Sequence, residues 1–175
     1  MRLYVLPLVI AGSALLGLAS ASHAQPAHEH EHEHGPAHAG ESALVAKLEL
    51  DAGKRWPTDA SLRSGMAAIR TAFDADHPAI HAGKQSDAQY EALAGRVETE
   101  VNSIVANCKL PPAADAQLHY VVGDLLQGVA LMRGADPDKS RHDGAARVHG
   151  ALRAYGKYFD DPSWTTGAPE QAHDH

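Results

Sequence analysis

Apolar residues recur at spacings of three and four in four segments of the chain, which is the period of one face of an α-helix. The first stripe is Leu62, Met66, Ile69 and Phe73, and the second is Tyr90, Leu93, Val97, Val101, Ile104 and Cys108. The third is Leu118, Val121, Val122, Leu125, Val129 and Met132, and the fourth is Ala145, Val148, Leu152, Tyr155 and Phe159. The pattern predicts four amphipathic helices.

Turn and capping residues delimit these helices. A capping-box pair, Ser86 with Gln89, precedes the second stripe, and Asp76-His77-Pro78 is a break after the first. The predicted helices cover residues 58–75, 87–108, 112–133 and the stretch between Asp136-Pro137 and Asp161-Pro162. Because the later connections are only a few residues long, neighbouring helices should be antiparallel. We therefore expect an all-α fold, an up-down-up-down four-helix bundle at 58–164, preceded by a linker at 42–57.

Composition agrees with a single helical domain. The chain has 175 residues, of which 33 are Ala while Phe and Trp supply two each, and no run alternates with period two. The glycines inside the predicted helices, such as Gly128 and Gly144, are unfavourable for isolated helices. Close backbone approach or tertiary packing must compensate for them.

The first 24 residues have the features of a signal peptide. Arg2 is followed by the apolar run Leu3 to Leu18 and by Ser22-His23-Ala24, a small-x-small cleavage pattern. The alternative is a membrane anchor, but the run is short for a bilayer span and contains Pro7. We expect a periplasmic protein without a membrane span once the signal peptide is removed, and a disordered C-terminal tail at 165–175.

The net charge and the histidine content favour metal ions as binding partners. A net charge of −7 opposes the attraction of phosphates, so nucleic acid is not expected as a partner. Thirteen His accompany a single Cys, and imidazole is a ligand for transition metals. Five of the His lie in a predicted disordered tail at 25–41, where His alternates with Glu: His28, His30, His32, His34 and His38. Such a tail can wrap a cation such as Zn²⁺ or Cu²⁺; the alternative is a solvated low-complexity linker.

A second candidate site lies within the predicted bundle. Counting residues along antiparallel helices places Met66, His119 and His149 at a similar depth, with Cys108 at the nearer end. A thioether with one or two imidazoles could hold copper, or haem iron as axial ligands. The alternative is that Met66 and Cys108 are core residues and the two His are boundary residues.

The other end of the bundle carries a weaker candidate. His77 and His81, expected in the first loop, could approach His142, with Asp74, Asp76 and Asp138 nearby. The chain contains no nucleophile elbow, Walker loop, dinucleotide-binding glycine pattern or paired cysteine motif. An enzyme is therefore not expected.

Several strings carry a family resemblance. They are Trp56-Pro57-Thr58-Asp59, Leu62-Arg63-Ser64-Gly65-Met66, Ile104-Val105-Ala106-Asn107-Cys108-Lys109-Leu110, Ala114-Asp115-Ala116-Gln117-Leu118-His119 and Tyr155-Gly156-Lys157-Tyr158-Phe159. With them, residues 50–164 resemble a group of small, largely uncharacterised exported proteins of proteobacteria, some labelled DnrO-like. The resemblance implies periplasmic residence.

The architecture is also similar to the b-type and c′-type four-helix cytochromes, with two departures. No Cys-x-x-Cys-His is present, and Tyr155, Tyr158 and Phe159 stand where the b-type pattern would have a His. The leading hypothesis is a periplasmic protein that binds copper or zinc for buffering, storage or delivery, with or without a protein partner. A haem-binding electron carrier and a structural or sensor-partner module are the alternatives.

Overall fold

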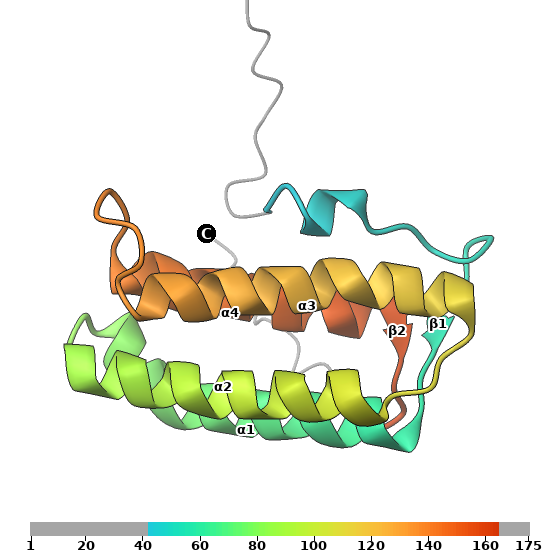
Figure 1. Cartoon of the computed structure of the whole chain (residues 1–175), viewed down its shortest axis with the longest axis horizontal. Helices are drawn as coiled ribbons and strands as arrows, with labels where there is room; N and C mark the ends of the chain where they lie inside the picture. Colours follow the sequence, from blue (N-terminus) through green and yellow to red (C-terminus); the bar gives the residue numbers. More distant parts are fainter. Residues whose placement is uncertain (1–41, 165–175) are drawn as a thin grey trace, which may run out of the picture. The chain divides into compact units, whose positions relative to one another are not determined.

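The computed structural model describes residues 42–164, which form an antiparallel bundle of four helices (Figure 1). The helices are α1 (Ala60–His81), α2 (Asp87–Asn107), α3 (Pro112–Met132) and α4 (Arg141–Tyr158). Each helix packs against the next in sequence, and α1 also packs against α4. The predicted all-α, up-down-up-down bundle is confirmed.

Three of the four helices begin at side-chain caps. Asp59 Oδ1 accepts a hydrogen bond from the backbone N–H of Leu62 at 2.7 Å, which caps α1. Capping boxes start α2 at Ser86, as predicted, and α4 at Ser140. Pro112 stands at the first position of α3, where the lack of an N–H costs nothing.

The end of α1 differs from the prediction. The helix does not stop at residue 75 but continues through Pro78 to His81. Pro78 removes one backbone hydrogen bond, yet Ile80 is only 4% exposed and anchors the last turn in the core. Burial of an apolar side chain contributes about 1.5–3 kcal/mol, which offsets much of the proline penalty. The prediction of a loop here was wrong, and His77 and His81 lie on a helix.

The core is built from the four predicted stripes. Nearly every stripe residue is buried, while Val122 and Cys108 are half-buried. The largest fully buried side chains include Tyr155, Phe159 and Met66. The helical period therefore located the core correctly.

Two glycines allow α3 and α4 to approach each other closely. A Cβ atom on Gly128 would lie 2.8 Å from the Gly144 carbonyl oxygen, and one on Gly144 would lie 2.6 Å from the backbone nitrogen of Met132. Neither distance is compatible with a side chain unless the helices separate. Close backbone approach thus explains these two glycines.

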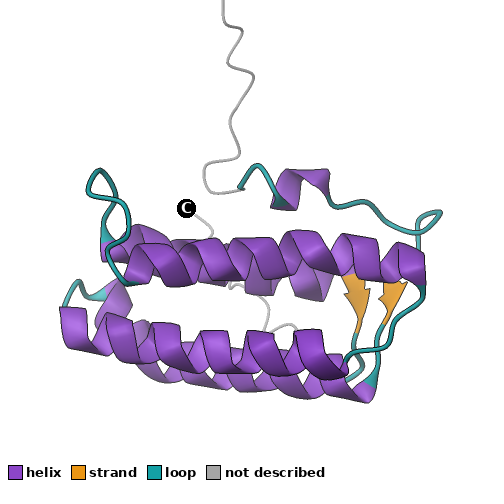
Figure 2. Cartoon of the chain, viewed as in Figure 1, coloured by secondary structure: helices purple, strands orange, loops and turns teal. Residues whose placement is uncertain are grey.

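The segment before α1 is more than a connection. A short 3-10 helix, η1 (Val45–Lys47), packs on α3 and α4, and Val45 and Leu48 enter the core. Two-residue strands β1 (Trp56–Pro57) and β2 (Phe159–Asp160) then pair in parallel, as Figure 2 shows in orange. The Thr58 hydroxyl donates to the Asp160 carbonyl at 2.7 Å. These contacts fasten the start of α1 to the end of α4, and the sequence pattern did not predict them.

Candidate metal-binding site

The tail histidines His28, His30, His32, His34 and His38 lie outside the described residues, as do the predicted signal peptide and C-terminal tail. The prediction that the tail binds metal therefore stays a prediction. The candidates on the bundle are placed by the structure.

Met66 occupies the interior of the bundle. It lies on α1 with no exposed surface, within the cluster of buried apolar side chains. A thioether in this setting fills space and makes dispersion contacts, as methionine does in most cores.

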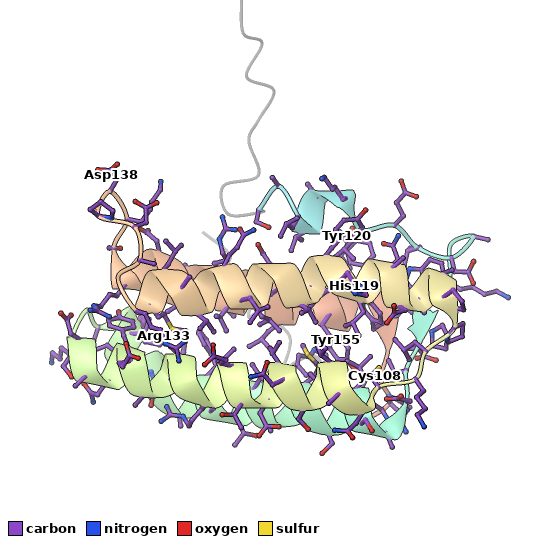
Figure 3. The ribbon with its side chains drawn as sticks, viewed as in Figure 1. Cys108, His119, Tyr120, Arg133, Asp138 and Tyr155 are labelled. Atoms are coloured by element: carbon purple, nitrogen blue, oxygen red, sulfur yellow. The ribbon has the colours of Figure 1, made fainter. Side chains whose placement is uncertain are left out.

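His119 lies on the outer surface of α3 (Figure 3). Its side chain is 72% exposed, and its Nδ1 is 2.7 Å from the carbonyl oxygen of Asp115, one turn earlier on the same helix. Because a carbonyl only accepts, Nδ1 carries the hydrogen in this contact and Nε2 is left to solvent. In this conformation His119 and the buried Met66 do not share a site.

Cys108 caps the end of α2 and is half-buried. Burial, followed by the charge of Asp59 and a hydrogen bond to its carboxylate, raises the pKa of the thiol to about 11. The thiol is therefore protonated at neutral pH, whereas metals bind the thiolate. Metal binding at Cys108 would have to expel that proton and break the contact with Asp59.

Tyr155 fills the core at the end of α4. Its hydroxyl donates to the Asp161 carboxylate at 2.9 Å, and both residues are buried. Burial and this hydrogen bond raise the pKa of Tyr155. The pair satisfies two buried polar groups and links the last turn of α4 to the segment that follows.

His149 is brought to a different neighbourhood from the other bundle candidates. Its ring stacks on Phe73 of α1, with ring centroids 5.3 Å apart and an angle of 15° between the planes. The His77 ring lies 5.9 Å from that of His149, and the His81 ring lies 6.0 Å from that of His77. We call His77, His81 and His149 the imidazole cluster; all three residues are exposed.

The electrostatic setting of His149 favours its neutral ring. Burial of the ring face against Phe73, followed by the charges of His77 and Arg153, lowers the pKa of His149, while Asp74 acts in the opposite direction. An imidazole that is neutral at pH 7 has a lone pair free for a metal ion.

The sequence predicted only part of this arrangement. His77 and His81 were expected near His142, and the structure places a histidine that was not expected there, His149, beside His77. A signal was present, because His77 follows Phe73 by four residues and so continues the buried stripe of α1. Within residues 42–164, no three His, Cys, Asp or Glu side chains already stand close enough to hold a metal ion.

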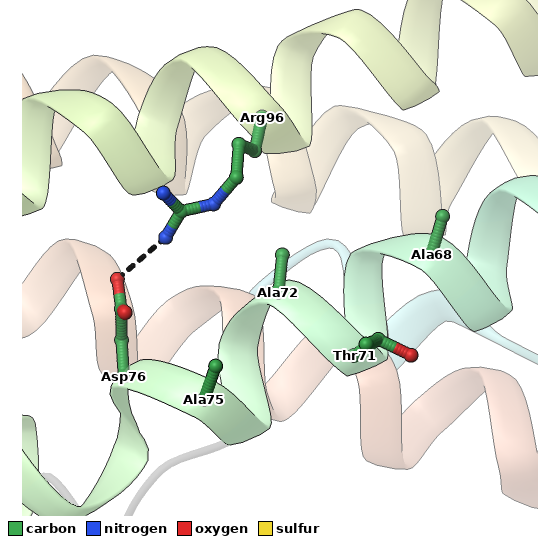
Figure 4. Close-up of a pocket in the computed structure, with 6 residues that line it drawn as sticks. All are labelled: Ala68, Thr71, Ala72, Ala75, Asp76 and Arg96. Atoms are coloured by element: carbon green, nitrogen blue, oxygen red, sulfur yellow. Dashed lines mark hydrogen bonds and ion pairs between the residues drawn. The ribbon is translucent and has the colours of Figure 1, made fainter.

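A shallow groove lies between α1 and α2 and is open to solvent (Figure 4). Small side chains form its floor, and the ion pair between Arg96 Nη2 and Asp76 Oδ2, at 2.7 Å, borders it. The Gln85 side chain also donates to Asp76. The charges at this groove are paired with each other, and the groove presents no ligand set.

No family model, curated protein or solved structure matches this chain. The DnrO-like and cytochrome resemblances are accordingly left as predictions. None of the helices in residues 42–164 is long and apolar enough to cross a membrane.

Proposed function

We propose that this protein binds divalent transition-metal ions, copper or zinc first among them, and serves to buffer, store or deliver them outside the cytoplasm. The observation that carries the proposal is the density of imidazoles in the tail, five between His28 and His38, with Glu between most of them. Imidazole nitrogen suits Zn²⁺, Cu²⁺ and Ni²⁺, and the intervening carboxylates add negative charge that attracts the cation.

The bundle supports this proposal as a scaffold. Its interior is packed with apolar side chains, and its only two buried charged residues among 42–164 are Asp124 and Asp161. Asp124 pairs with Arg147 at 3.0 Å, and Asp161 accepts from Tyr155. All five histidines within residues 42–164 are exposed, so the interior of the bundle offers no imidazole to an ion.

Isothermal titration with Zn²⁺ and with Cu²⁺ tests the proposal. The whole chain is compared with a variant in which His28, His30, His32, His34 and His38 are all replaced by Asn, the tail-His variant. A matched control replaces Glu29, Glu31 and Glu33 by Gln and keeps every imidazole. We expect the tail-His variant to bind fewer ions, and the control to bind the same number more weakly. Absence of binding by the whole chain would overturn the proposal.

A further inference from the structure

The unbroken end of α1 creates a pair of imidazoles on one helix face. Because the helix continues through Pro78, His77 and His81 are four residues apart on α1, and their rings face each other at 6.0 Å. Two histidines at this spacing on a helix are the arrangement by which many proteins chelate zinc. A loop at this position would not fix the two rings in this way.

A second helix supplies the third imidazole. His149 of α4 lies 5.9 Å from His77, ring centroid to ring centroid. Phe73 is only 2% exposed, and its ring stacks against that of His149. The centroid of the same ring lies 5.8 Å from that of His77. The buried phenyl ring therefore forms a fixed floor from which two of the imidazoles project to solvent.

The separations of the His77 ring from the other two rings are near those of bound imidazoles. With metal–nitrogen bonds of about 2.0–2.1 Å, two rings on one tetrahedral ion have centres roughly 5 Å apart. The observed 5.9 and 6.0 Å exceed this by about 1 Å, a distance that rotation of exposed side chains covers. Residues 42–164 hold no preformed ligand set, so an ion has to draw the rings together as it binds.

We infer that His77, His81 and His149 form a second metal site, on the folded bundle, that takes a divalent ion of the Cu²⁺ or Zn²⁺ class. This inference rests on the proposed function and extends it from the tail to the folded bundle. Three imidazoles without a protein carboxylate select borderline ions over Mg²⁺ and Ca²⁺. Three protein ligands also leave a coordination position open to water or to a competing ligand, so the ion can exchange.

The test uses the tail-His variant, so that the bundle is titrated without the tail imidazoles. Zn²⁺ and Cu²⁺ titrations of this chain are repeated after adding His77→Ala, His81→Ala or His149→Ala, with His119→Ala as the matched control. His119 is an exposed histidine on the outer surface of α3, outside the imidazole cluster. Each substitution in the cluster should weaken metal binding at least about tenfold. Losing even a residue that only hydrogen-bonds to a metal ligand typically lowers metal affinity about 10–100-fold. His119→Ala should leave the affinity unchanged.

His81→Ala distinguishes the loss of a metal ligand from a loss of folding stability. His81 is exposed and its ring packs against that of the exposed His77, so its loss should leave the thermal midpoint of the metal-free protein unchanged. A bound ion should raise the midpoint of the tail-His variant, and His81→Ala should abolish that rise.

The outcomes separate the two proposals. If the whole chain binds ions but the tail-His variant binds none, or if its binding survives all three cluster substitutions, the bundle site is overturned and the tail proposal stands. If the tail-His variant binds and loses affinity with each cluster substitution, the bundle site is supported. If the whole chain binds nothing, both proposals fall.

Discussion

The close approach of α3 and α4 gives a sharp prediction at Gly144. A methyl group there would lie 2.6 Å from the Met132 nitrogen, 2.7 Å from the Gly128 carbonyl oxygen and 2.9 Å from Leu131 Cβ. All three atoms belong to α3, and two of them are backbone atoms that no rotamer change can move. Gly144→Ala therefore has to push the two helices apart.

The expected cost is the difference between two effects. Overpacking a tight contact costs about 1–3 kcal/mol, and backbone contacts place this site toward the upper end of that range. Replacing Gly by Ala within a helix contributes about 0.8–1.0 kcal/mol in the opposite direction. The free energy of unfolding should fall by about 1–2 kcal/mol, with a decrease of several degrees in the thermal midpoint.

Urea denaturation followed by circular dichroism measures this change, and Gly95→Ala is the matched control. Gly95 lies within α2, and a Cβ built there meets nothing within 4 Å. The control should gain about 0.5–1 kcal/mol from helix propensity. If Gly144→Ala were as stable as Gly95→Ala, the close approach of α3 and α4 would be refuted.

Three further predictions concern Asp59 and its neighbour Cys108. Asp59→Ala removes the cap of α1 and the hydrogen bond from the Lys109 N–H, 2.6 Å from Oδ2, so unfolding should become easier by about 1–3 kcal/mol in urea denaturation. Burial raises the pKa of Asp59, but hydrogen bonds from Leu62 and Lys109 and the other contacts outweigh it, and the net pKa lies below the ordinary 3.8. The stability that the charged carboxylate contributes is therefore present above pH 3.8 and is lost as pH falls through the folded-state pKa. The difference in free energy of unfolding between the native protein and Asp59→Asn should become smaller over that pH range. The Cys108 thiol, with its pKa raised to about 11, should react with iodoacetamide at pH 7.5 more slowly than the urea-unfolded chain does.

The pH dependence at Asp59 and the alkylation of Cys108 can each be contradicted by one result. A gap between the native protein and Asp59→Asn that is constant from pH 7 to pH 3 would show that the carboxylate charge contributes nothing. Alkylation of Cys108 in the folded protein at the unfolded rate would show that burial and the Asp59 contact do not hold its proton.

The sequence predicted the parts of the fold that depend on local signals. Stripes at helical spacing identified the core, and the Ser86–Gln89 pair identified the start of α2, because periodicity and capping act within one helix. The end of α1 was missed because Pro78 is a local stop signal, whereas the burial of Ile80 that overrides it is a tertiary effect. Strands β1 and β2 have two residues each, too short to show any period.

In the candidate site too, the sequence predicted what depends on one helix and missed what depends on its neighbours. His119 and His149 each follow a buried stripe residue by one position, which turns a side chain by about 100° around its helix. For His119 that direction leads to solvent, and for His149 it leads to Phe73 and His77 of α1. The difference depends on which neighbouring helix stands beside the position, and a stripe on a single helix does not contain that information.

The most direct test of metal binding is elemental analysis of the whole chain after equilibrium dialysis against an equimolar mixture of copper, zinc, nickel and cobalt. We expect each chain to retain more than one ion, with copper or zinc in excess. We also expect the tail-His variant to retain fewer ions and to lose the remainder when His81→Ala is added. A chain that leaves dialysis with no bound metal would contradict both proposed metal sites.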